Sequence, residues 1–292
     1  MKISKTPGER IFHILNYAFL LLLTLAFIIP FWTTIVTSFV GETERLRRGM
    51  FIFFPEKIDL SAYKTILSKG SDVYSGYAVT LTRTVLGTLA NMTATIMLAF
   101  GLAKRDLPFR TPITFAIYFT MLFSGGLIPT FLVVKYTGLY NNMGAYIVPG
   151  LISVWNLFLL RNFLMEIPVS LEEAAYIDGA TPAKMLIKII IPLSMPAIAT
   201  ISLFYAVWHW NSWFDALIYI SNNRLLPLQM ILRNIIIASN TENIIDTATV
   251  RPPPLETVKG ATIVVSTLPI LCAYPFVQKY FVKGIMVGGV KG

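Results

Sequence analysis

Charged residues are spaced so unevenly along this chain that they restrict it to one class of fold. If Asp, Glu, Lys and Arg are taken as breaks, only six uncharged intervals among the 292 residues reach 19 residues. A helix needs about 20 mostly apolar residues to cross the hydrocarbon core of a membrane, so each interval suffices for one crossing. The sequence therefore predicts an all-α integral membrane protein with six transmembrane helices in a single domain, residues 1–292. The predicted spans are residues 12–38, 78–103, 111–135, 144–163, 197–220 and 260–281.

The composition agrees with this class and argues against two others. Only 13% of the residues are charged, whereas soluble domains have roughly 25%. The net charge of +9 would suit a nucleic-acid-binding protein, but the basic residues are scattered between apolar runs, so no nucleic-acid partner is expected. Two histidines and one cysteine offer no metal cluster, and the nucleotide-binding loop G-x-x-x-x-G-K-[ST] does not occur. We therefore expect no enzyme, no metal and no cofactor on this chain.

The short loops predict how the helices cross the membrane. An even number of spans places both chain ends on one side. The positive-inside rule applies best to short loops, and residues 104–110 carry three basic residues whereas residues 136–143 carry none. We therefore expect both termini, and the polar segment 166–196, on the cytoplasmic side of the plasma membrane.

That polar segment lies between two long apolar runs and is expected to begin with a short helix. Ser170 and Glu173 have the spacing of a capping box, in which each side chain bonds the backbone amide of the other residue. Gly179 stands where a glycine commonly ends a helix. A helix this short does not persist alone in water, so it needs a surface on which to pack.

A second short helix is expected directly after the first. Thr181 is a typical capping residue, and Pro182 suits the first helical position. Since proline cannot continue an ordinary helix, this helix is expected to run until Pro192 and Pro196 break it.

A spaced motif runs through both helices. It consists of Glu173-Ala174-Ala175, then Gly179 after three residues, then Ile189 to Pro192 after nine more. In this motif the chain resembles the EAA loop of binding-protein-dependent ABC importer permeases, which implies the type I importer (MetI-like) fold. The residues that the resemblance assigns to ATPase coupling are Glu172, Glu173, Ala174, Ala175, Asp178, Gly179 and Ala180.

Other residues resemble one branch of that family. The run Asp178-Gly179-Ala180 looks like the carbohydrate-uptake branch, similar to the maltose permeases. Residues 123–129 and 281–292 resemble permeases for aldouronate or alginate oligosaccharides. The resemblance implies that the chain imports sugars, chiefly oligosaccharides, and forms half of a translocation path.

The resemblance also implies an assembly in the plasma membrane. A second homologous permease completes the path, two ABC ATPase subunits bind ATP and magnesium, and an extracytoplasmic solute-binding protein delivers the sugar. If the helix at 170–179 docks on an ATPase subunit, it acts as a lever that rocks the spans between inward and outward openings.

The fifth apolar run is the richest in side chains that could contact a sugar. Aromatic rings have flat apolar faces and polar edges, which suit the C–H faces and hydroxyls of sugars. An aromatic belt at the membrane surface, or hydrogen bonds between helices, are the alternative roles. The candidate solute-path residues are Tyr205, Trp208, His209 and Asn211, with Asn156 from the fourth run.

Two rival classes of transporter remain open. An ABC permease for amino acids or peptides would share the EAA loop. An ion-coupled secondary carrier would need titratable groups within the membrane, and His209 and Asp215 are the candidates. Arg83, near the outer end of the second run, is expected to snorkel towards the membrane surface, and the alternative is a charge that faces a polar route.

Overall fold

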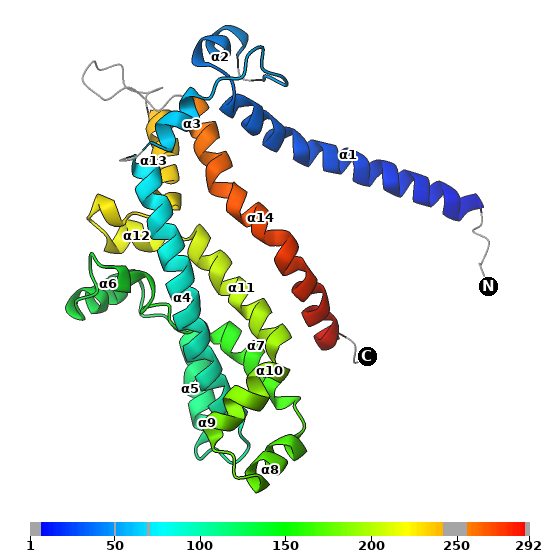
Figure 1. Cartoon of the computed structure of the whole chain (residues 1–292), viewed down its shortest axis with the longest axis vertical. Coiled ribbons are helices and arrows are strands. Elements are labelled where there is room, and N and C mark those ends of the chain that lie inside the picture. Colours follow the sequence, from blue (N-terminus) through cyan, green and yellow to red (C-terminus); the bar gives the residue numbers. More distant parts are fainter. Residues whose placement is uncertain (1–6, 50, 69–70, 242–255, 290–292) are drawn as a thin grey trace. The chain divides into compact units, whose positions relative to one another are not determined.

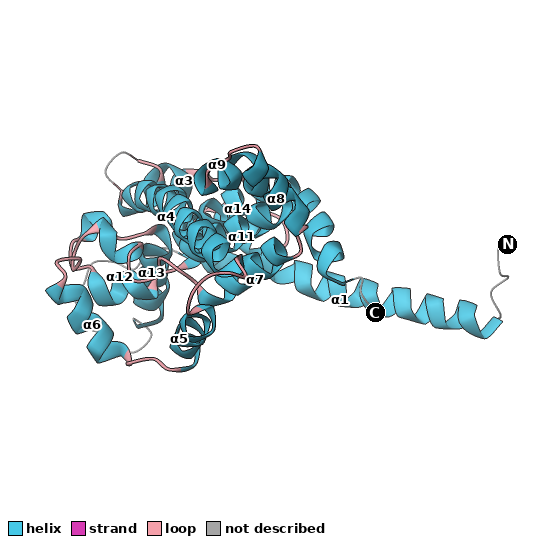
Figure 2. Cartoon of the chain, turned by 90° about the horizontal axis from the view of Figure 1, so that it is seen from below, coloured by secondary structure: helices cyan, strands magenta, loops and turns pink. Residues whose placement is uncertain are grey.

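The computed structural model describes residues 7–49, 51–68, 71–241 and 256–289. This part of the chain consists of helices and the loops between them, and no strand occurs in it (Figure 2). The chain forms two compact units, residues 1–71 with 234–267 and residues 72–233 with 268–292. The two helices that contribute to both are α13 (Leu228–Thr241) and α14 (Glu256–Gly289).

The first unit has three helices of its own (Figure 1): α1 (Pro7–Ser38), α2 (Glu42–Arg48) and α3 (Ser61–Ile66). The end of α1 packs closely on α14, because a Cβ at Gly260 would lie 3.2 Å from the carbonyl oxygen of Thr34. The Ser38 hydroxyl lies 2.7 Å from the Tyr63 hydroxyl on α3. Most apolar side chains of α1 are exposed, which suits a helix surrounded by lipid.

The second unit is organised around α4, a helix of 32 residues that packs along α7 and α11 (Figure 1). In chain order its elements are α4 (Asp72–Ala103), α5 (Arg110–Leu122), α6 (Leu127–Tyr136), η1 (Met143–Tyr146), α7 (Val154–Met165), α8 (Val169–Ile177), α9 (Pro182–Met185), η2 (Leu186–Ile190), α10 (Ile191–Leu193), α11 (Met195–Asn211), α12 (Phe214–Tyr219) and η3 (Asn223–Leu225).

Two buried clusters hold this unit together, one at each end of α4. The cluster at the C-terminal end joins α4 to α7, α8, α9 and α11 through residues such as Leu102, Leu160 and Met185, each at most 1% exposed. The cluster at the N-terminal end joins α4 to α6, η1 and α12, with Tyr146 and Ala216 at its centre.

Breaks in the helices change the form of several predicted spans. Helices α1 and α4 are each long and apolar enough to cross a membrane. The predicted span 111–135 is a bent pair: α5 and α6 meet at 114°, next to Gly126, whose φ of +88° favours glycine. The predicted span 197–220 is interrupted between α11 and α12, 144–163 is α-helical only from Val154, and 260–281 lies inside α14. The count of six crossings and their direction stay predictions.

The second short helix continues through Pro192, and the predicted break lies between Pro192 and Pro196. Residues 186–190 form a π-helical turn, in which the Ile191 N–H bonds the Leu186 carbonyl, and α10 follows without a gap. Because a π turn shifts the bonding by one residue, the N–H that proline lacks is not needed there. The helix ends at Ser194, between the two prolines, where the chain bends by 84° into α11.

Candidate functional site

The first helix of the polar segment is α8, and it does not begin as a capping box. Helical geometry starts at Val169, with Pro168 in the capping position and no side-chain bond to the first turn. Ser170 is therefore already inside the helix, so the predicted cap at Ser170 is wrong. The physical reason is local: the extended conformation of Pro168 (ψ 128°) leads directly into the helix, two residues earlier than the box requires.

The other end of α8 is closed by a glycine, as predicted. Gly179 has φ +69°, and its N–H bonds the Tyr176 carbonyl at 3.0 Å. The Ala180 N–H bonds the Ala175 carbonyl at 2.9 Å, which completes the Schellman pattern of helix C-termini. The start of α9 is also confirmed, because the Thr181 hydroxyl accepts the Lys184 N–H and Pro182 takes the first helical position.

The predicted coupling residues lie on two faces of α8. Ala175 is buried (5% exposed) in the cluster at the C-terminal end of α4, and Ala180 packs against that cluster. Glu173, Ala174, Asp178 and Gly179 are exposed. The most exposed apolar side chain on α8 was not singled out from the sequence: Ile177 is 87% exposed. Its position just before Asp178-Gly179 was the sequence feature that could have indicated its exposure.

Glu172 and Glu173, although adjacent, have different surroundings. The Glu172 carboxylate accepts a hydrogen bond from the Lys104 ammonium at 2.5 Å, and both side chains are partly buried. Lys104 follows directly after α4. The pair therefore ties α8 to the C-terminal end of α4, while Glu173 is exposed at the rim of a hollow that both glutamates line.

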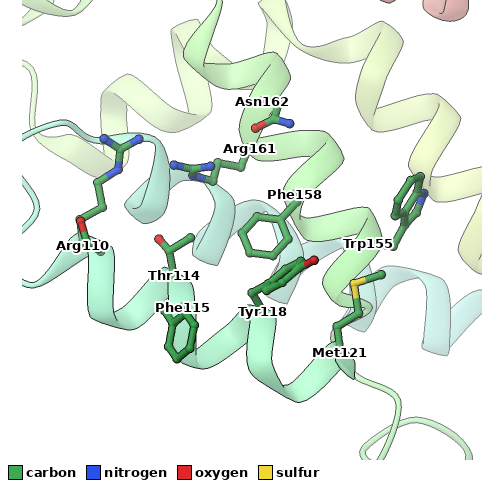
Figure 3. Close-up of a pocket in the computed structure, with 10 residues that line it drawn as sticks. Arg110, Thr114, Phe115, Tyr118, Met121, Trp155, Phe158, Arg161 and Asn162 are labelled. Carbon is green, nitrogen blue, oxygen red and sulfur yellow. The ribbon is translucent and has the colours of Figure 1, made fainter. Parts of the chain in front are cut away.

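A groove of about 740 Å³ lies between α5 and α7, and we call it the α5–α7 groove (Figure 3). Aromatic rings line much of it, with Tyr118 and Phe158 facing each other at 6.3 Å between ring centroids. Arg110 and Arg161 lie at one end, and Met121 and Trp155 lie at the other (Figure 3). The lining residues are Arg110, Thr111, Thr114, Phe115, Tyr118, Met121, Trp155, Phe158, Arg161 and Asn162. None of them was among the solute-path candidates, because α5 carries no motif.

Both arginines of the groove are held by the same backbone atom. The Nε–H of Arg110 and the Nε–H of Arg161 each donate to the Leu102 carbonyl oxygen at 3.1 Å. Carbonyls at the C-terminal end of a helix lack helical partners and carry partial negative charge, so they attract cations. This shared acceptor fixes two guanidinium groups close together in the groove.

Tyr205 and His209 on α11 are buried and bonded within the unit. The Tyr205 hydroxyl lies 2.9 Å from the Thr95 hydroxyl and accepts the Ser153 N–H at 3.0 Å. Nε2 of His209 lies 2.7 Å from Oδ1 of Asn91. These two candidates therefore fasten α11 to α4, and Tyr205 also holds the start of α7.

The remaining solute-path candidates have other environments. Trp208 is 45% exposed and lies against Gly150, where a Cβ would approach the indole to 2.8 Å. Asn211 is exposed, and its amide donates to the Val207 carbonyl at 2.8 Å. Asn156 is buried on α7 (7% exposed), and it does not line the α5–α7 groove.

The expectation that Arg83 snorkels is wrong. Its side chain is fully buried, and its guanidinium bonds the Asp215 carboxylate through Nη2 at 2.5 Å and Nη1 at 3.3 Å. The guanidinium also lies 4.2 Å from the ring centroid of Tyr146. Asp215, 132 residues further along the chain, thus gives the Arg83 guanidinium a polar partner inside the protein. Without it, the guanidinium would need the water and headgroups of the membrane surface.

Comparisons with known proteins agree with this arrangement. Residues 93–287 match the family model described as "binding-protein-dependent transport system inner membrane component". The chain is 45% identical to the polygalacturonan/rhamnogalacturonan transport system permease protein YtcP of Bacillus subtilis (strain 168), over 97% of this chain and 99% of that protein. It is 43% identical to protein LplC of the same organism, over 98% and 97% of the two chains.

A solved structure shows the same fold. A chain of a bacterial ABC transporter that imports the acidic polysaccharide alginate aligns with a TM-score of 0.86 and 32% identity, covering 96% of this chain and all of that one. The chain is therefore a membrane protein with the MetI-like permease fold, and it belongs to the family of binding-protein-dependent transport system inner membrane components.

Proposed function

We propose that this chain is a membrane-spanning subunit of an ATP-driven importer of acidic oligosaccharides. The α5–α7 groove is the main support for an acidic sugar as the substrate, because aromatic rings lie there beside the guanidinium groups of Arg110 and Arg161. Aromatic rings stack on the apolar faces of sugar rings, and guanidinium groups bind carboxylates with paired hydrogen bonds. Two of the similar proteins support the class by name, since polygalacturonan and alginate are both polymers of uronic acids.

The exposed face of α8 is the proposed contact with an ATPase subunit. Its Ile177 side chain offers an apolar anchor, while Glu173 and Asp178 offer charged partners around it. A short helix with such a face fits a groove on a partner, and small residues such as Ala174 allow a close approach. ATP and magnesium are bound by that partner, so this chain itself carries no catalytic or cofactor site.

The rest of the assembly follows from the family. A second homologous permease forms the other half of the path, and an extracytoplasmic binding protein delivers the sugar. Both termini and α8 face the cytoplasm. Closure of the two ATPase subunits on ATP displaces α8, and the spans alternate between outward and inward openings.

Trp208 and Asn211 stay in the proposal as solute contacts because both are exposed on α11. Tyr205, His209 and Asn156 are assigned to support of the path instead, since they are buried within the unit.

Purification and reconstitution of the complex test this function. The tagged chain is isolated from its native membrane with its companions, and ATP hydrolysis is measured in proteoliposomes with the co-purified binding protein. We expect oligogalacturonides to stimulate hydrolysis several-fold more than neutral oligosaccharides of equal length. Stimulation by amino acids or peptides alone would contradict the sugar assignment, and isolation of the chain without an ATPase would contradict the importer class.

A further inference from the structure

The C-terminal end of α4 is where the α5–α7 groove and α8 meet. The Leu102 carbonyl oxygen accepts one hydrogen bond from Arg110 of α5 and one from Arg161 of α7, each at 3.1 Å (Figure 3 shows both arginines). Two residues further along the chain, the Lys104 ammonium bonds Glu172 of α8 at 2.5 Å. Three helices are thus attached to a stretch of three residues.

The Lys104 side chain is held from several directions. Its ammonium lies 4.4 Å from the ring centroid of Phe100 and 3.7 Å from the sulfur of Met185, which is fully buried. The side chains of Lys104 and Glu172 are 19% and 25% exposed. A pair this sheltered is screened less by water and salt than a surface pair, and the ring adds a cation–π contact. The pair is therefore a directed attachment rather than a loose surface contact.

We propose that Lys104 and Glu172 are a positioning pair that transmits the displacement of α8 to α4, while the neighbouring Glu173 is left for the partner subunit. The inference rests on the proposed function, in which α8 contacts an ATPase. It divides two adjacent glutamates of α8 between two tasks.

The size of α8 explains why such an attachment is needed. The helix has nine residues and joins α9 through the hydrogen-bonded turn at Gly179. Within the part of the chain that the structure describes, Lys104–Glu172 is the salt bridge that involves α8. Ala175 packs α8 against the cluster at the C-terminal end of α4, and this pair adds a directed polar contact beside that packing.

The attachment also leads to the groove. Displacement of Lys104 acts on Leu102, whose carbonyl orients both arginines of the α5–α7 groove. The end of α4 thereby couples the position of α8 to the groups that we assign to the carboxylates of the sugar. Occupancy of the groove and docking at α8 then influence each other, as thermodynamic coupling requires.

The test uses the whole complex in proteoliposomes and the variants Lys104→Met, Glu172→Gln and the charge swap Lys104→Glu with Glu172→Lys. In each single variant we expect uptake to fall about tenfold and stimulation of hydrolysis by the loaded binding protein to be lost, with the ATPase still co-purifying. The charge swap is expected to restore part of both. Arg105→Met, at the adjacent exposed position, is the matched control and should behave like the wild type.

Other results would overturn the proposed role of the Lys104–Glu172 pair. Loss of ATPase co-purification in Glu172→Gln, to the same degree as in Glu173→Gln, would make Glu172 a docking residue and overturn the inference. So would wild-type uptake in both single variants. If the single variants do not accumulate in the membrane, the charge swap decides: coupled uptake supports the pair, and a swap that accumulates but stays uncoupled overturns it. A wild-type chain that recruits no ATPase would count against the proposed function instead.

Discussion

Polar side chains in the middle of α4 are fully buried, whereas those at its C-terminal end are partly exposed to water. Along the middle, Arg83 and Asn91 are fully buried and meet Asp215 and His209 from the region of α11 and α12. At the end, Lys104 meets a carboxylate that water still reaches. Breaking a buried pair leaves an unpaired polar group in a low-dielectric interior, whereas a partly exposed pair retains contact with water and costs less to rearrange.

The difference separates the parts that stay together from the parts that move. The seam between α4 and α11 behaves as one body, because each polar contact in it is costly to open. The contacts around Lys104 can follow a displaced α8. Variants of the α4–α11 contacts and variants near α8 test this difference.

Removal of the carboxylate that pairs with the buried Arg83 is expected to have the largest effect. Asp215→Ala leaves the guanidinium of Arg83 buried without its partner, so the free energy of unfolding should fall by about 3–5 kcal/mol. Unfolding from mixed micelles with sodium dodecyl sulfate measures this change. Asp106→Ala, at an exposed carboxylate, is the control and should change stability little. Equal stability of the two variants would contradict the buried seam.

Overpacking of the same seam should cost less. A Cβ at Gly87 would collide with the imidazole of His209, so Gly87→Ala is expected to destabilise the chain by about 1–3 kcal/mol. Gly101→Ala on the same helix meets no atom within 4 Å, so it should be neutral or stabilise by about 1 kcal/mol. The same unfolding titration distinguishes them, and a neutral Gly87→Ala would show that α11 can move away from α4.

A change at the movable end should affect docking more than folding. Gly179→Ala places a side chain at φ +69°, which costs about 1–2 kcal/mol and loosens the turn after α8. We expect weaker co-purification of the ATPase. Gly138→Ala, at φ +74° between α6 and η1, should carry a similar conformational cost but leave ATPase association intact. Equal loss of association in both variants would assign the effect of Gly179 to folding.

Glu44 in the first unit offers a reference pair for which we expect the smallest effect. The pKa of the Glu44 carboxyl is lowered, chiefly because it accepts the Glu56 backbone N–H at 2.9 Å and also bonds Arg48. Since the folded pKa is depressed, this contribution to local stability is complete above the unfolded pKa and is lost as the pH falls through the folded pKa.

Protection of the Glu56 amide against hydrogen exchange, corrected for the intrinsic rate, should therefore fall on acidification. Glu44→Gln should have lower protection at neutral pH and no such loss in acid. An unchanged acid loss in the variant would assign the effect to another group.

Local chemistry explains which features of the site could be predicted. The turn at Gly179 and the cap at Thr181 depend on the conformational preferences of single residues, so the sequence is sufficient for both. The start of α8 was misplaced by two residues because Ser170 fits a cap equally well in isolation, and only the conformation of Pro168 decides.

Contacts between distant segments explain what could not be predicted. The Arg83–Asp215 pair joins residues 132 apart, and neither residue carries a local signal for the other. The aromatic character of α11 was visible, but which of its side chains face α4 depends on packing, so Tyr205 and His209 could not be distinguished from Trp208. The α5–α7 groove was missed for the same reason, because its arginines come from separate helices.

The most direct test of the account compares an acidic sugar with its neutral counterpart in the reconstituted complex. Uptake of an oligogalacturonide and of its carboxyl-reduced form is measured with the same binding protein, for the wild type, Arg161→Gln and the control Arg105→Gln. We expect the preference of the wild type for the acidic sugar to fall about tenfold in Arg161→Gln and to persist in the control. An unchanged preference in Arg161→Gln would contradict the assignment of the α5–α7 groove to the carboxylates of the solute.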